Sequence, residues 1–136
     1  MKIYHSTLLA MTIAALMASS AQAELVVIVN PKSPAASMTA DEVANVYLGK
    51  DPSFAPVDLP ESAQARADFY KKVAGKDGAQ VKALWARLVF TGKMRPPKEM
   101  ANSSDALKFV AGNDRGIAYI DRSAVDSSVK AVLTVN

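Results

Sequence analysis

The stretch DLPESAQARADFY, residues 58–70, combines residue types that could bind an anion at the start of a helix. A helix start carries free backbone N–H groups and a partial positive charge, which together suit a tetrahedral oxyanion. Ser62 could add a hydroxyl, Ala63 leaves the backbone accessible, and Arg66 follows one turn later with a guanidinium that can bind two oxygens. The alternative is an ordinary helix start in which Ser62 is only the N-cap. Local chemistry leaves both interpretations open.

A second loop offers related chemistry. ELVVIVN, residues 24–30, is a continuous apolar and β-branched run typical of a strand buried on both faces, and the loop PKSPAAS follows it. Ligands of open α/β sheets bind beyond the carboxyl ends of the strands. We therefore expect Asn30 and Ser33 to contribute to the same anion site as the helix start.

The residue types exclude most common enzyme designs. The sequence contains no Cys, and its one His lies at position 5. Beyond that position, neither a Ser-His-Asp or Cys-His nucleophile nor a Cys/His zinc site can be built. Asp58 and Glu61 could act as an acid–base pair, but loop carboxylates usually serve capping and solubility. We expect a protein that is not an enzyme and has no cofactor or metal.

The first 23 residues have the pattern of a secretory signal peptide. Lys2 is followed by the apolar run 8–17 and by Ala21-Gln22-Ala23, a small-x-small cleavage site. The apolar run is too short to span a membrane. We expect cleavage after Ala23, a periplasmic location, and a single domain over residues 24–136.

Apolar strands alternate with amphipathic helices in this domain. Trp85 belongs to a helical apolar stripe that includes Val89, so it is expected to pack in the core. We expect strands at 24–30, 57–59, 116–120 and 129–135, helices after the caps Thr39, Ser62 and Ser103 or Ser104, a further helix over 81–89, and a turn or short helix at 121–125. This order predicts a single α/β layered fold with a mostly parallel or mixed central sheet flanked by helices.

Positive charge is concentrated in one part of the chain. Residues 66–98 carry nine Lys or Arg and two Asp or Glu, while the whole sequence has a net charge of +3. Such a stretch is either the solvated faces of two helices or a surface that attracts anions, acidic proteins or membrane headgroups. Nucleic acid is not expected, because few aromatic residues are interleaved with the basic ones.

Four segments together resemble a known family. They are VVIVNPKSP, ADEVANVYLGK, FYKKVAGKDGAQVKALWARLVFTGKMRPPKE and GIAYIDRSAV, in this order and spacing. They are similar to the small exported relatives of phosphate-type ABC-transporter substrate-binding proteins, in the class II periplasmic-binding superfamily. The resemblance covers nearly all of residues 24–136 and implies the fold of one lobe of such a protein.

The resemblance also implies a ligand. In full-length members, phosphate lies between two lobes and is bound by a Ser-Gly-Thr-like turn with a nearby arginine. Glu61-Ser62-Ala63 and Arg66 match that turn, but Ala63 and Gln64 replace its Gly and Thr. Since the second lobe is missing, the resemblance implies weak binding of phosphate or a similar oxyanion, with Kd on the order of millimolar.

Two further expectations concern protein partners. An envelope protein or a second copy of the chain would close the open side of the site. The alternative function is a ligand-free accessory subunit of the cell envelope, whose basic stretch 66–98 would dock an acidic partner.

Overall fold

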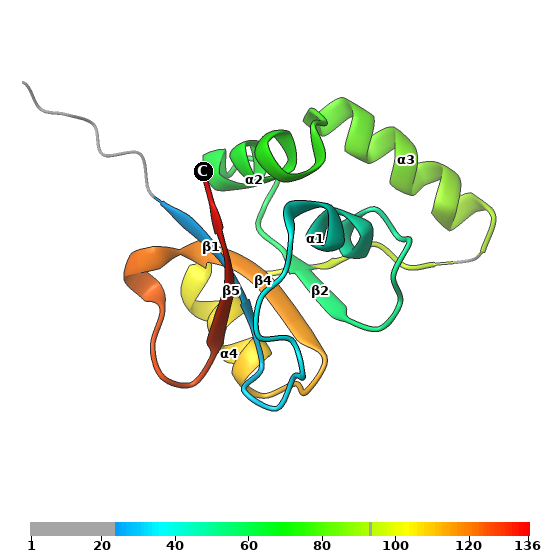
Figure 1. Ribbon diagram of the computed structural model, residues 1–136. Helices are drawn as coiled ribbons and strands as arrows, with labels where there is room; N and C mark the ends of the chain where they lie inside the picture. The colour runs from blue at the N-terminus through cyan, green and yellow to red at the C-terminus, as the bar shows by residue number, and fades with distance from the viewer. Residues whose placement is uncertain (1–23, 93) are drawn as a thin grey trace, which may run out of the picture.

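A five-stranded mixed sheet forms the centre of the computed structural model, which describes residues 24–92 and 94–136 (Figure 1). The strands are β1 (Leu25–Val29), β2 (Ala55–Asp58), β3 (Lys98–Glu99), β4 (Gly116–Asp121) and β5 (Lys130–Val135), in the spatial order β3-β2-β4-β1-β5. β2 runs parallel to β3 and β4, whereas β1 runs antiparallel to β4 and β5. The expected α/β class with a mixed sheet is confirmed. The predicted signal peptide lies outside the described residues.

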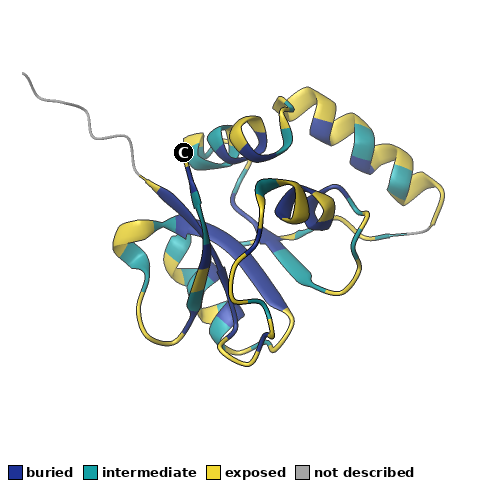
Figure 2. Cartoon of the chain, in the orientation of Figure 1, coloured by how far each residue is buried: buried dark blue, intermediate teal, exposed yellow. Residues whose placement is uncertain are grey.

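β1 is buried on both faces, as its continuous apolar sequence predicts. Val27 and Val29 point into one core cluster and Ile28 into the other, since successive side chains of a strand alternate between faces. The first cluster packs under α1, α2 and α3, and the second packs under α4. The sheet is therefore covered by helices on both sides, and Figure 2 shows the central strands β1 and β4 almost entirely buried.

The helices agree broadly with the sequence pattern. They are α1 (Ala40–Tyr47), α2 (Gln64–Phe69), the π-helical turn η1 (Tyr70–Ala74), α3 (Gly78–Phe90), α4 (Ser103–Ala111) and the 3-10 turn η2 (Arg122–Ala124). The helix expected after Ser62 is thus two segments, because α2 widens into the π-helical turn η1, which ends at Gly75. No helix within residues 24–92 and 94–136 has the length and apolarity needed to cross a membrane.

The helix caps confirm one prediction and correct two. Thr39 forms the expected capping box with Glu42 at the start of α1. The predicted cap Ser62 is wrong, because Ala63 is the N-cap of α2 and makes no side-chain cap. Its backbone N–H donates to Pro60, which closes a turn just before the helix. The predicted caps at Ser103 or Ser104 are also wrong, since Asn102 accepts from the N–H of Asp105.

In α3, the prediction that Trp85 packs in the core is confirmed, but Val89 of the same apolar stripe does not pack there. The Trp85 side chain is buried, and its indole N–H donates to the carbonyl of Tyr47 over 3.0 Å. Val89 fits the same helical stripe, yet it is 49% exposed. The last turn of α3 is covered only on the side of Leu88, which packs against Gly49, while Val89 lies on the uncovered side of a helix that extends away from the sheet in Figure 1.

Candidate functional site

Asp58 is a buried carboxyl at the end of β2, with 3% of the residue exposed. Its Oδ2 accepts a hydrogen bond of 2.6 Å from the Tyr70 hydroxyl, and its Oδ1 accepts from the Tyr119 hydroxyl and from the Leu59 N–H. The parallel pairing of β2 with β4 brings Tyr119 beside Asp58, and η1 brings Tyr70 from the helical side. The carboxyl is therefore satisfied entirely by groups of the chain.

Stacked aromatic rings hold these hydroxyls in place. Phe69 lies parallel to Tyr119, with ring centroids 3.9 Å apart, and it meets Tyr47 edge-on at 4.8 Å. The Tyr47 hydroxyl donates 2.8 Å to the carbonyl of Val57, so this ring binds backbone and not Asp58. Such packing limits the positions from which Tyr70 and Tyr119 can donate.

Burial dominates the electrostatics of the cluster. It raises the pKa of Asp58 from its ordinary value, while hydrogen bonds from Tyr119 and Tyr70 and the charge of Arg66 act in the opposite direction. Burial, followed by the nearby Asp58 charge, also raises the pKa of both Tyr70 and Tyr119. The two tyrosines therefore remain neutral hydrogen-bond donors at physiological pH.

Arg66 covers this cluster on the solvent side. Its Nη1 donates 2.9 Å to the carbonyl of Leu59, and its Nε lies 3.8 Å from Oδ1 of Asp58. A second carboxylate, that of Glu99, lies 4.0 Å from Nη1, and the guanidinium lies 5.9 Å from the centre of the Tyr70 ring. With 20% of the side chain exposed, Arg66 is fixed in position yet still accessible from one side.

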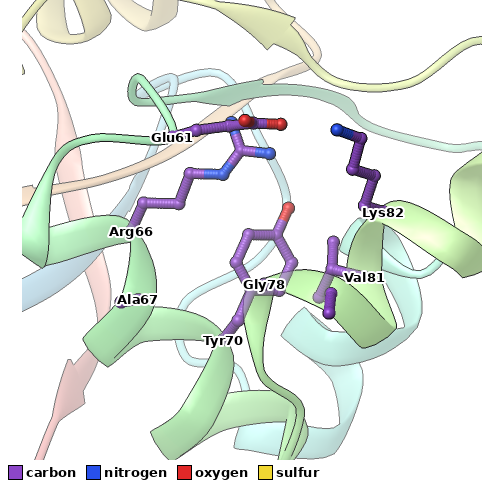
Figure 3. Close-up of a pocket in the computed structure, with 8 residues that line it drawn as sticks. Glu61, Arg66, Ala67, Tyr70, Gly78, Val81 and Lys82 are labelled. Carbon is purple, nitrogen blue, oxygen red and sulfur yellow. The ribbon is translucent and has the colours of Figure 1, made fainter.

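Two adjoining hollows lie beside Arg66, with volumes of about 290 and 210 Å³. They share Glu61, Arg66, Val81 and Lys82, so we treat them as one groove between α2 and α3. Figure 3 shows the charged ends of Glu61, Arg66 and Lys82 and the hydroxyl of Tyr70 directed toward the same space. The second hollow extends the groove past Trp85 to Pro96 and Pro97.

α3 supplies the far wall of the groove. It begins with a reciprocal capping box between Asp77 and Gln80, which fixes the direction of its first turn. Val81 and Trp85 are buried on its inner face, and Lys82 follows Val81 at the groove. The sequence analysis did not single out Lys82, because its role depends on the packing of α3 against α2.

The groove contains both signs of charge. Arg66 and Lys82 attract an anion, whereas the carboxylates of Glu61 and Glu99 reduce that attraction. Among the described residues, no cluster of acidic or histidine side chains could hold a metal ion. The arrangement can hydrogen-bond a small oxyanion through guanidinium and ammonium donors, in competition with carboxylates that already face them; the single Tyr70 proton is already donated to Asp58.

Neither Ser62 nor Ala63 lines this groove. They follow Glu61, which lines both hollows, and they precede the first turn of α2, which presents Arg66. Ser62 is exposed and Ala63 is half-buried. Of the predicted residues Ser62, Ala63 and Arg66, it is Arg66 that lines the hollows, while Ala63 packs against the core.

Asn30 and Ser33 are not brought to the groove, contrary to expectation. β1 is antiparallel to β4, with Leu25 opposite Asp121 and Val29 opposite Ile117. The carboxyl end of β1 therefore lies at the opposite edge of the sheet from that of β2. The side-chain amide of Asn30 donates 2.9 Å to the carbonyl of Val110 at the end of α4. The Ser33 carbonyl accepts 2.8 Å from the Lys130 ammonium.

Comparisons with known proteins identify solved structures of similar fold. No protein-family model matches the sequence, and no curated protein does. Solved structures do match. One, from Clostridium perfringens, is described as a phosphate ABC transporter substrate-binding protein with bound phosphate; it is 21% identical, with a TM-score of 0.66. Another is an ABC-type phosphate transport receptor from Vibrio cholerae, which is 19% identical, with a TM-score of 0.63. PstS from Borrelia burgdorferi is 9% identical, with a TM-score of 0.62.

Each of these three matches covers 80% of this chain but only 44–46% of the solved protein. The chain therefore has the α/β fold of phosphate substrate-binding proteins and spans less than half of their length. The resemblance in the four sequence segments is confirmed at the level of the fold.

Proposed function

We propose that the protein binds phosphate or a similar oxyanion weakly in the groove between α2 and α3. The observation that carries the proposal is the convergence of the positively charged ends of Arg66 and Lys82 on one hollow (Figure 3). Arg66 presents a guanidinium that is held by Leu59 and only partly exposed, which reduces the entropy lost on binding. The presence of phosphate in a structure of the same fold supports the proposal.

The proposed site keeps part of the predicted set of residues. Ser62 and Ala63 immediately precede the helix that presents Arg66 and remain in the proposal, whereas Asn30 and Ser33 leave it because they lie at the other edge of the sheet. Binding, not catalysis, is the proposed role. Export to the periplasm through the leader 1–23 is part of the same proposal.

Weak affinity follows from charge and openness. Glu61 and Glu99 compete with the ligand for Arg66, and solvent reaches the groove from one side. Ion pairs with an anion that remains half in water stabilise the complex less than ion pairs in a cleft from which water is excluded. We expect a Kd on the order of millimolar, which corresponds to a binding free energy of about −4 kcal/mol. An envelope protein or a second copy of the chain placed over the groove would raise the affinity.

The test is an NMR titration with phosphate, sulfate and chloride at fixed ionic strength. Amide and arginine side-chain signals are followed in the protein from Glu24, a segment that contains the helices, strands and both core clusters of the described residues. Saturable shifts at Arg66 and Lys82 that favour phosphate are expected. Equal responses to all three salts, or shifts confined to other surfaces, would remove the proposal.

A second candidate function is a ligand-free accessory role in the cell envelope. The observation in its favour is that Arg66 already has partners of its own, the carbonyl of Leu59 and the carboxylates of Asp58 and Glu99. In that case the same titration would show no saturable, anion-selective change. The groove residues would then serve only to join α2 to the end of β2.

A further inference from the structure

The end of α3 exposes large apolar side chains. Phe90 is 92% exposed and Val89 is 49% exposed, and they are the exposed large hydrophobic residues among those the structure describes. They lie at the tip of the helix that reaches furthest from the sheet in Figure 1, and Figure 2 shows this helix largely exposed. A single exposed apolar residue is common, but an adjacent pair on a protruding tip indicates a contact surface.

Basic residues also lie near this tip. Residues 78–98 contain five Lys or Arg and no Asp or Glu. Lys82 faces the groove and Lys98 lies over the Phe109 ring, so the two that we assign to the tip are Arg87 and Arg95. Arg87 lies three residues before Phe90, which places both on one side of the helix. Met94 packs with Leu88 against Gly49. Since Arg95 follows Met94 directly, it lies close to the last turn of α3. Neither arginine forms an ion pair within the described part of the chain.

The shape of this surface favours a lipid partner over a protein. A stable protein interface buries about 800 Å² on each side around a well-packed apolar centre. Two side chains at the end of one helix are too few to form such a centre. An anionic lipid surface needs no shaped pocket, because it accepts an aromatic side chain among the headgroups and attracts basic residues around it.

We propose that the α3 tip, defined as Arg87, Val89, Phe90 and Arg95, associates reversibly with anionic phospholipid surfaces. Phe90 enters the interface between headgroups and acyl chains, and the two arginines contact the lipid phosphates. The contact is peripheral and depends on ionic strength, because its charges act at an exposed surface. This inference is independent of the anion groove, since the tip and the groove use different residues.

The test is co-sedimentation of the protein from Glu24 with vesicles of phosphatidylcholine alone or of phosphatidylcholine and phosphatidylglycerol in equal amounts. We expect binding to the mixed vesicles only, and its loss at high salt. Phe90→Ser should lower the partition coefficient about tenfold, which is the contribution of one buried Phe side chain. Phe90→Trp should retain binding and give a blue-shifted emission on mixed vesicles.

Charge is tested with a matched pair of double variants. Arg87→Gln with Arg95→Gln should reduce binding about tenfold, since each basic residue near the membrane adds to the attraction. Lys32→Gln with Lys108→Gln removes the same charge from exposed positions outside the tip and should change binding less than twofold. Equal loss in both double variants would show that only net charge matters and would overturn the proposed surface.

Two further results would also overturn it. The first is an unchanged partition coefficient for Phe90→Ser in a variant whose melting curve matches the original protein. The second is loss of vesicle binding in Arg66→Gln or in the presence of inorganic phosphate, because the lipid phosphate would then occupy the groove and not the α3 tip. Absence of binding to both kinds of vesicle would exclude a lipid partner.

Discussion

The Tyr70 hydroxyl donates a 2.6 Å hydrogen bond to the Asp58 carboxylate across the contact between the π-helical turn η1 and the end of β2. Asp58 is buried, so this bond replaces water that the carboxyl loses on folding. Arg66 lies over the same pair and faces the groove. The bond thus connects the stability of the fold to the position of the proposed ligand-binding arginine.

Removing this donor should destabilise the protein. Tyr70→Phe leaves the aromatic packing but takes one hydrogen bond from a buried carboxyl, so the free energy of unfolding should fall by about 1–3 kcal/mol. Urea unfolding measures the change. In an Asp58→Asn background, the cost of Tyr70→Phe should be smaller, because a neutral amide needs the donor less. An equal cost in both backgrounds would show that Tyr70 acts through packing alone.

The pH dependence of stability has a definite sign at Asp58. Burial raises its pKa above the ordinary 3.8, so the folded protein holds this proton more tightly than the unfolded chain. The stability that this proton contributes is fully present below pH 3.8 and is lost as pH rises through the folded-state pKa. Relative to Asp58→Asn, the original protein should therefore lose stability as pH rises from below 3.8 toward neutrality.

Asp126 provides the control of opposite sign. Hydrogen bonds from the Ser128 hydroxyl and N–H lower its pKa, so its contribution is present above the unfolded value and is lost as pH falls. Relative to Asp126→Asn, the original protein should therefore lose stability as pH falls over the same pH series. If the Asp58 trend followed the direction of Asp126, the raised pKa of Asp58 would be wrong.

Gly49 should tolerate no side chain. Its φ of 78° favours glycine, and a Cβ there would lie 2.8 Å from Cδ1 of Leu88 and 3.2 Å from the Trp85 ring. Gly49→Ala should lower the free energy of unfolding by about 1–3 kcal/mol through backbone strain and overpacking of α3. Gly78→Ala is the control, because a Cβ at the first residue of α3 meets no neighbouring atom. Equal melting temperatures for the two variants would contradict this packing.

Local sequence patterns predicted the elements well where neighbours in sequence determine them. The apolar run of β1, the Thr39 capping box and the apolar stripe of α3 around Trp85 all appear as expected. These features depend on propensities and contacts within about one or two helical turns. The exposed end of α3 was not predictable, because the helical stripe continues past the last residue that the core can cover.

The site was only partly predictable, because strand direction is a non-local property. The segment around Arg66 predicts its own helix, whereas Asn30 and Ser33 are expected at the site only because they follow the carboxyl end of a strand. Pairing with β4 reverses β1 and moves its carboxyl end to the other edge. Tyr119 is 61 residues from Asp58 in sequence, so no local signal could have joined them.

The central claim, oxyanion binding at Arg66 and Lys82, is tested most directly by phosphate titrations of matched charge variants followed by NMR. Lys82 is exposed, so Lys82→Gln should leave the fold unchanged and raise Kd about threefold; Arg66→Gln should raise it about tenfold. Lys108→Gln on α4 removes the same charge and should leave Kd unchanged. The account is contradicted if all three variants, each folded by its NMR spectrum, bind phosphate as the original protein does.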